Sequence, residues 1–135
     1  MTFHLQIVTP DGVSFDGEAE SLYVRTQTGD IGLLPKHIDY VSALGMGQAK
    51  VTVEGETRTA ACIGGMVSVS GGEVKLVATT FEWSEEIDVA RAKDAELRAR
   101  KILEEKKLSD EELRLAEARL HRALVRQSVG KKWLP

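Results

Sequence analysis

The stretch EEIDVARAKDAELRAR, from Glu85 to Arg100, marks a boundary between two kinds of sequence in this chain. It is rich in alanine and in long unbranched side chains, which favour an α-helix. The sequence before it is different, because 11 of the 12 glycines lie before residue 83 and only Gly130 lies after it. This change predicts two domains within the 135 residues, a first domain over 1–84 and a helical second domain over 85–135.

Residues 1–84 show the alternation of apolar and polar side chains that is typical of β-strands. The runs FHLQIVT, ESLYVRT, AKVTVEG and EVKLVATT carry this alternation. Turn dipeptides separate the runs, among them Asp11-Gly12, Asp16-Gly17 and Gly71-Gly72. Many short strands at intervals of roughly ten residues predict an antiparallel β-sandwich or flattened barrel.

The second domain carries the signals of two helices. Good helix formers dominate from Ile87 onward, and Ser109-Asp110-Glu111-Glu112 forms a capping box that marks the start of a second helix. Apolar residues recur at helical spacing in both segments, and a two-helix antiparallel hairpin follows from them. The chain is therefore expected to be an α+β protein, with an all-β N-terminal domain followed by this hairpin. The two apolar stripes are Val89, Ala92, Ala95, Ala99 and Ile102 in the first helix, and Leu113, Ala116, Leu120, Ala123 and Leu124 in the second.

The seam between the two helices is mostly alanine. Alanine removes little apolar surface from water, so the adhesion between the helices is expected to be modest. The connecting segment KKLSD contains neither glycine nor proline, and one continuous helix over 87–129 stays an alternative. Such a helix would be roughly 65 Å long at about 1.5 Å per residue. We infer a marginal hairpin that is able to open or straighten.

Charge is distributed unevenly along the chain, whose formal net charge is −3. Residues 1–83 hold 5 basic and 10 acidic side chains, whereas basic side chains outnumber the single Glu117 over 113–135. This basic segment suits an acidic protein partner or is a solvated face. It does not suit nucleic acid, because its one aromatic residue is Trp133 and the rest of the chain is acidic. The basic residues are Arg114, Arg119, Arg122, Arg126, Lys131 and Lys132.

No arrangement of residues indicates a catalytic or a metal site. The histidines are scattered, with no second His or Cys at ligand spacing, so no metal is expected. No Ser/His/Asp or Cys/His set is recognisable, and the glycines of 28–47 lack the Gly-Lys-Ser/Thr ending of a phosphate loop. Cys62 sits in an apolar run and is expected to be buried. No apolar run approaches the roughly 18 residues of a membrane span.

The segment TGDIGLLPKHIDYVSALGMG over 28–47, followed by a β-rich segment and then IDVARA, resembles the ε subunits of bacterial F-type ATP synthases. One departure is Asp39, where the family commonly has proline. The resemblance covers the whole chain in order and implies a β-sandwich followed by a helical hairpin. The family usually shows Gly-x-x-Gly-x-Leu-Pro-x-His, which Gly29, Gly32, Leu34, Pro35 and His37 match.

This resemblance implies a non-catalytic subunit of the rotating stalk, which couples proton transport to ATP synthesis. It implies a peripheral position at the cytoplasmic face of the bacterial plasma membrane, reached only through the complex. In the family the sandwich binds the γ subunit and the ring of c subunits. The hairpin either folds against the sandwich or extends along γ into the catalytic head, where it restrains ATP hydrolysis. Its basic residues then meet an acidic segment of the β subunit, which here implies Arg114, Arg119, Arg122, Arg126, Lys131 and Lys132.

The resemblance also implies a regulatory ATP site, with no covalently bound cofactor and with the part played by magnesium left open. Some bacterial ε subunits, those of bacilli especially, bind ATP between sandwich and hairpin through an Ile/Leu-Asp-x-x-Arg-Ala signature. Ile87, Asp88, Arg91 and Ala92 match every fixed position. Approximate alignment adds Glu82, Arg98, Arg122 and Arg126. Arginines suit phosphates, and a carboxylate accepts hydrogen bonds from an amine or a hydroxyl.

Other interpretations stay open at the level of sequence. The chain could be a free-standing β-sandwich interaction module with a helical arm, and co-purification with a γ-type coiled coil separates the two. An enzyme using Glu82, Asp88 or His37 as acid or base is disfavoured, because no paired catalytic set accompanies them. Asp88 and Arg91 also admit a plainer reading as an i,i+3 ion pair, or Asp88 as one of the acids that favour a helix N-terminus.

Overall fold

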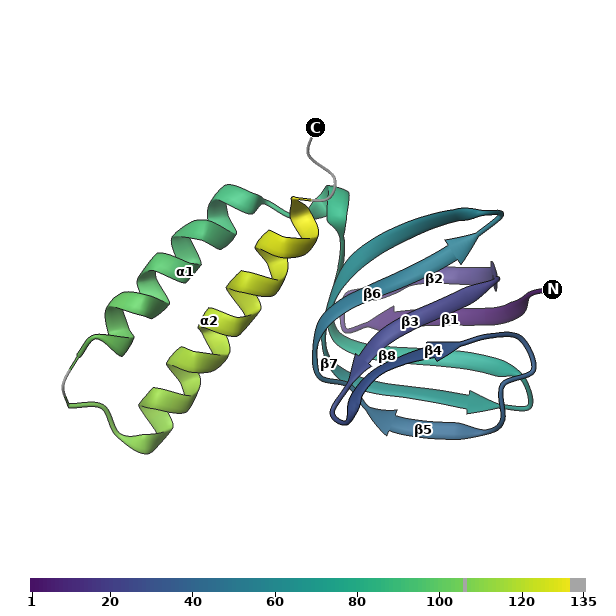
Figure 1. Cartoon of the computed structure of the whole chain (residues 1–135), viewed down its shortest axis with the longest axis horizontal. Helices are drawn as coiled ribbons and strands as arrows, with labels where there is room; N and C mark the ends of the chain where they lie inside the picture. Colours follow the sequence, from purple (N-terminus) through teal and green to yellow (C-terminus); the bar gives the residue numbers. More distant parts are fainter. Residues whose placement is uncertain (106, 132–135) are drawn as a thin grey trace. The chain divides into compact units, whose positions relative to one another are not determined.

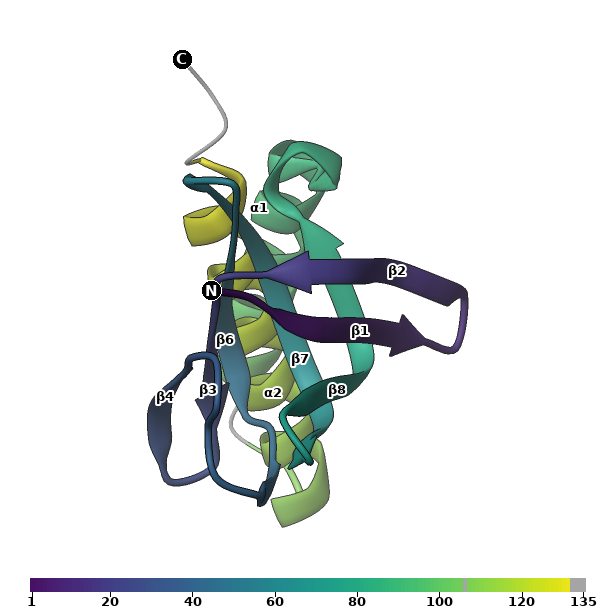
Figure 2. The same ribbon diagram turned by 90° about the vertical axis from the view of Figure 1, so that its right-hand side faces the viewer.

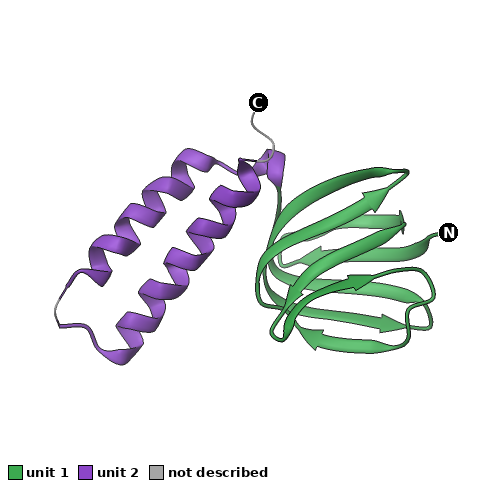
Figure 3. Ribbon diagram, in the orientation of Figure 1, with its two compact units in different colours: residues 1–83 green, residues 84–135 purple. Residues whose placement is uncertain are grey.

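The computed structural model describes residues 1–105 and 107–131 (Figure 1). They form two compact units, Met1–Trp83 and Ser84–Pro135 (Figure 3). The first unit contains the strands and the second the helices, so the predicted β-sandwich followed by a helical hairpin is confirmed. The strands are β1 (Phe3–Thr9), β2 (Gly12–Ala19), β3 (Ser21–Thr26), β4 (Gly29–Leu33), β5 (Tyr40–Ala43), β6 (Met46–Val53), β7 (Glu56–Ser70) and β8 (Glu73–Trp83).

The eight strands form one sheet in the order β2-β1-β8-β7-β6-β3-β4, and β5 pairs with β7. Seen from the side, the β1–β2 and β3–β4 hairpins lie on opposite sides of the strands β6 to β8 (Figure 2). One pair differs from the antiparallel expectation, because β1 and β8 run parallel. These are the first and the last strand, and their long separation in sequence leaves either direction open, whereas a tight hairpin imposes an antiparallel pair.

The core of the first unit lies between the two inner faces of the folded sheet. Alternate residues of the strands point into it, as the burial pattern of β8 shows. Cys62 is buried as expected, and burial raises the pKa of its thiol to about 12. The largest side chains that are fully buried in this unit are Leu5, Ile7, Leu22, Leu33, Leu76, Val24, Val51 and Val67.

The long strand β7 serves two partners on the same side, β6 along its first half and β5 near its end. The change of partner occurs at Gly64 and Gly65, whose φ angles are +71° and +111°. A Cβ atom added to Gly65 would lie 1.9 Å from the carbonyl oxygen of Val77 on β8. The backbone of β8 therefore approaches β7 at a place where only glycine fits.

The segment after β4 makes the bend that Pro35 predicts. The backbone N–H of His37 donates to the carbonyl of Leu34 at 3.2 Å, and Lys36 occupies the third position of this turn with a φ of +65°. Beyond the turn, the carboxylate of Asp39 accepts a hydrogen bond of 3.0 Å from the backbone N–H of Gly71. Asp39 thus anchors this loop to the β7–β8 turn.

The second unit begins with a short 3-10 turn, Ser84–Glu86, and continues as α1 (Val89–Leu103) and α2 (Asp110–Gly130). The capping box predicted at Ser109 and Glu112 is confirmed. Helix α1 starts two residues later than the expected Ile87, because Asp88 is extended and caps the helix instead of joining it. The two helices are separate, so the alternative of one continuous helix is not the state described. Neither α1 nor α2 is long and apolar enough to cross a membrane.

Candidate functional site

At the start of α1, the side chains of Asp88 and Arg91 in the IDVARA segment have different environments. One carboxylate oxygen of Asp88 accepts a hydrogen bond of 3.0 Å from the backbone N–H of Arg91. The side chain of Arg91 is exposed, and the described ion pairs include none between these two side chains. Asp88 is therefore the N-cap of α1, and the alternative interpretation of Asp88 and Arg91 as an i,i+3 ion pair is wrong. The guanidinium of Arg91 is left pointing into solvent.

The other two positions of the segment pack inside the hairpin. Ile87 and Ala92 are buried, with 9% and 4% of their surfaces exposed. A Cβ atom added to Gly130, at the end of α2, would lie 2.7 Å from a methyl group of Val89 and 3.0 Å from one of Ile87. The end of α2 thus approaches the start of α1 closely because Gly130 has no side chain. Ile87 and Ala92 support the site through packing.

The facing sides of the two helices are lined by the predicted alanines. Ala92, Ala99, Ala116 and Ala123 are 1–4% exposed. The leucines predicted to continue the stripe of α2 behave otherwise, because Leu113 and Leu124 are each 39% exposed. Small side chains at the seam bring the helices close together, which leaves bulkier neighbours at the edge of the contact.

Two polar residues complete the seam, and the sequence interpretation missed both. Glu96 of α1 and Gln127 of α2 are each 6% exposed. They follow Ala92 and Ala123 by four residues, and this i,i+4 spacing was the signal that places them on the seam. Hydrogen bonds from Gln127, Arg100 and Lys93 hold the pKa of Glu96 at about 2, so this carboxyl is ionised at neutral pH.

The four predicted arginines of the hairpin share one face. Arg91 and Arg98 immediately precede the buried Ala92 and Ala99 of α1, and on α2 Arg122 and Arg126 immediately precede Ala123 and Gln127. A preceding residue lies about 100° around the helix. Because the helices are antiparallel, these two rotations lead to the same side of the hairpin. We call this set the arginine face; it is exposed on α1 and half-buried on α2.

The remaining predicted ATP contact lies in the other unit. Glu82 is near the end of β8, where it is half-buried and pairs in register with Ala61 of β7. It belongs to the sandwich, whereas the arginine face belongs to the hairpin.

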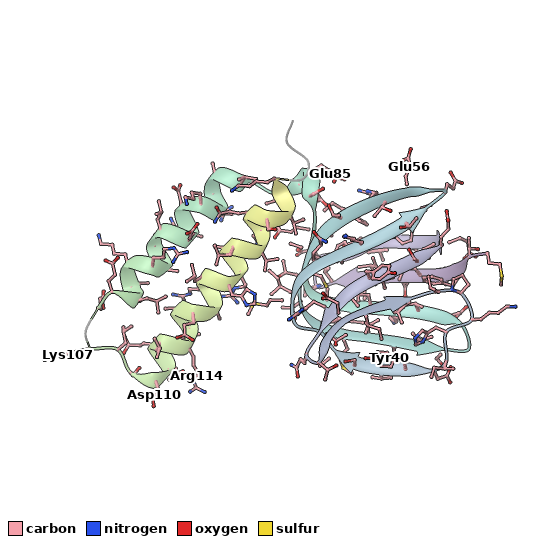
Figure 4. All side chains as sticks on the ribbon, in the orientation of Figure 1. Tyr40, Glu56, Glu85, Lys107, Asp110 and Arg114 are labelled. Atoms are coloured by element: carbon pink, nitrogen blue, oxygen red, sulfur yellow. The ribbon has the colours of Figure 1, made fainter. Side chains whose placement is uncertain are left out.

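The basic residues assigned to a β-subunit contact spread along α2. Arg114 lies near its start, close to the connection that carries Lys107 (Figure 4). Arg119, Arg122 and Arg126 lie within about 60° of one another around the helix axis. Lys131 follows the last residue of α2 and is exposed, and Lys132 lies outside the described residues. The described residues contain no group of three or more side chains suited to a metal ion.

Comparisons with known proteins match both units. The family model for the β-sandwich domain of ATP synthase delta/epsilon chains matches residues 2–84, and that for their long α-helix domain matches residues 85–129. The chain is 40% identical to an ATP synthase epsilon chain of Exiguobacterium sp. over 95% of both chains. It is 39% identical to that of Bacillus velezensis, over 96% of this chain and 97% of the relative.

Solved structures show the same fold. A chain of the Euglena gracilis mitochondrial ATP synthase superposes with a TM-score of 0.83 at 22% identity, over 94% of this chain and 80% of that one. A chain from the central stalk and c-ring of the Tetrahymena thermophila enzyme gives 0.65 at 13% identity, over 94% and 95%. From the family models and the relatives together, the chain belongs to the ATP synthase delta/epsilon family, whose members are non-catalytic subunits of that complex.

Proposed function

We propose that this chain is the ε subunit in the rotating stalk of a bacterial F-type ATP synthase and that its hairpin senses ATP. Relatives of that name match it over nearly its full length. The sandwich binds the γ subunit and the c-ring, and the chain reaches the cytoplasmic face of the membrane through these partners. The chain carries out no chemistry of its own. Its role is mechanical coupling and regulation of the complex.

The arginine face is the observation that carries the ATP proposal. It gathers guanidinium groups from both helices on one side of the hairpin, with Ala95 between Arg91 and Arg98 on α1. Guanidinium groups bind phosphate oxygens in a charge-assisted, often bidentate manner. A triphosphate that contacts arginines of both helices favours the closed hairpin over an open one. Binding to the closed form alone adds about 2.7 kcal/mol when ATP is present at about a hundred times its dissociation constant.

Isothermal titration of the full-length chain with ATP tests this proposal. We expect saturable binding at one site per chain, much weaker binding of ADP because it offers one phosphate fewer, and discrimination against GTP. A second titration with EDTA in place of magnesium shows whether the metal accompanies the nucleotide. Heat signals no larger than those of dilution would remove ATP sensing and leave the stalk role alone.

The extended hairpin restrains ATP hydrolysis through charge in this proposal. The variant Arg119→Ala, combined with Lys131→Ala, removes basic side chains without touching the four residues of the arginine face. We expect it to inhibit ATP hydrolysis by a reconstituted catalytic head less than the wild-type chain does, most clearly at low ionic strength. Ser128→Ala is the control, because this exposed residue of α2 carries no charge. Equal inhibition by all three proteins would show that the hairpin acts by its bulk.

A further inference from the structure

A buried ionised carboxylate crosses the seam of the hairpin. The side-chain amide of Gln127 on α2 donates a hydrogen bond of 2.8 Å to one oxygen of Glu96 on α1. The guanidinium of Arg100 donates to the other oxygen at 2.6 Å, and the ammonium of Lys93 lies 3.2 Å from the first. Both carboxylate oxygens are thus satisfied, by two residues of the same helix and by one residue of the facing helix.

Apart from the contact of Gly130 with Val89 and Ile87 at one end, the seam offers little to distinguish one alignment of the helices from another. Its middle consists of alanines, whose side chains offer neither size nor polarity to fix which residue of α1 faces which residue of α2. The hydrogen bond between Glu96 and Gln127 occurs in the same alignment of the antiparallel helices that brings Gly130 against Val89. If α2 shifted by one turn, about 5.4 Å, Glu96 would face Ala123 or the end of the helix.

A shifted alignment would leave two buried polar groups without partners. The carboxylate of Glu96 would lose the amide of Gln127, and that amide would be buried against alanine. Unpaired buried polar groups are strongly unfavourable, whereas a satisfied pair is tolerated. A single buried polar residue fixes register and partner choice in coiled coils for the same reason. Among the alignments open to these helices, the observed one satisfies both groups.

We propose that Glu96 and Gln127 are positioning residues whose hydrogen bond sets the register of the hairpin and thereby aligns the arginine face. This register fixes how far Arg98 of α1 lies from Arg122 and Arg126 of α2 along the hairpin axis. A shift of one turn would change these offsets by about 5.4 Å, although every arginine would stay on the same side. The link to nucleotide rests on the proposed function, whereas the role in register does not. The pair also gives the alanine seam a specific contact before any ligand binds.

Distance measurement between spin labels on the full-length chain tests the register. Labels at Asp94→Cys and His121→Cys sit on exposed positions of α1 and α2 that are offset by roughly two turns along the hairpin axis. This offset makes the distance sensitive to sliding. The one native thiol, Cys62, is buried with a pKa of about 12 and therefore does not compete for the label.

Four variants carry the comparison in the labelled background. Glu96→Ala leaves the buried amide of Gln127 without its acceptor. The distribution of distances between the two labels should therefore extend to longer values as the helices separate. Glu96→Gln still accepts from Gln127 and should keep the wild-type distance. Glu96→Leu with Gln127→Leu replaces the polar pair with an apolar one, so the hairpin should stay closed but occupy more than one register. Leu97→Ala changes the exposed neighbour of Glu96 and should alter nothing.

ATP titrations of the same proteins connect register to the arginine face. The ATP affinity of the double leucine variant should fall in proportion to the fraction of molecules in the productive register. If that fraction is about one third, the affinity falls about threefold. A single wild-type distance in both Glu96→Ala and the double leucine variant would overturn the positioning role. A shifted register with unchanged ATP affinity would overturn its link to the nucleotide. If the wild-type chain binds no ATP, the proposed ATP sensing fails, and the distances alone decide the positioning role.

Discussion

Replacing Arg91 by alanine should weaken ATP binding by about tenfold or more. A charge-assisted hydrogen bond contributes about 1.5–3 kcal/mol, and about 1.4 kcal/mol corresponds to tenfold in affinity. The side chain of Arg91 is exposed, while its backbone N–H makes the helix cap, which alanine retains. The variant should therefore unfold at the same temperature as the wild-type chain. Titration calorimetry and circular dichroism measure the two quantities on one sample.

Arg114→Ala is the matched control for this experiment. It removes the same side chain from the same hairpin, but near the connection between the helices and away from the arginine face (Figure 4). It should bind ATP like the wild-type chain. Equal losses of affinity in both variants would indicate a general effect of charge, and no loss in Arg91→Ala would return the IDVARA segment to a purely structural role.

Asp88 requires a different pair of variants because its carboxylate already caps α1. Asp88→Ala removes the cap, which typically contributes about 1 kcal/mol, as well as any contact with nucleotide. Asp88→Ser keeps a capping oxygen and removes only the charge. If ATP affinity falls in both variants, the carboxylate contacts the ligand. If it falls in Asp88→Ala alone, the residue acts by holding the start of the helix.

Gly65→Ala should lower the free energy of unfolding of the sandwich by roughly 3 kcal/mol or more. If the wild-type value is not much larger than this, the variant will not fold. The φ angle of +111° at Gly65 is strained for any other residue, and the added Cβ would meet the Val77 carbonyl at 1.9 Å. Relieving that contact requires β7 and β8 to separate where they pair. Urea denaturation followed by circular dichroism measures the loss directly.

Gly12→Ala provides the control for the steric part of this effect. Gly12 has a φ of +129°, yet an added Cβ would meet no atom within 4 Å. Its replacement should cost about 1 kcal/mol, from backbone conformation alone. Similar costs at the two positions would mean that the backbones of β7 and β8 relax around the new methyl group at Gly65, and the close approach would then not explain why glycine is needed there.

Local sequence patterns were sufficient to predict the two-part architecture and many of its local features. Period-two runs identified β1, β3, β6 and β8, and the capping box placed the start of α2, because these signals act over a few residues. The turn predicted at Asp16-Gly17 is wrong, because both residues pair with β1 inside β2. The predicted apolar stripes were confirmed at Ala92, Ala99, Ala116 and Ala123, which are buried between the helices. The IDVARA segment and the motif around Pro35 indicated the right family, because both are short contiguous patterns that depend on residue identity alone.

Contacts between segments that are distant in sequence could not be predicted and are known from the folded structure. The parallel pairing of β1 with β8, and the need for glycine at position 65, arise between strands that are distant in sequence or meet backbone to backbone. Asp88 emerged as a cap instead of an ion-pair partner, because its carboxylate binds the backbone N–H and not the guanidinium of Arg91. Glu96 and Gln127 have the polar side chains of solvent-facing residues, yet each is covered by the other helix. Spacing within each helix places both residues on the seam, but their contact with each other depends on the register of the two helices, which that spacing does not contain.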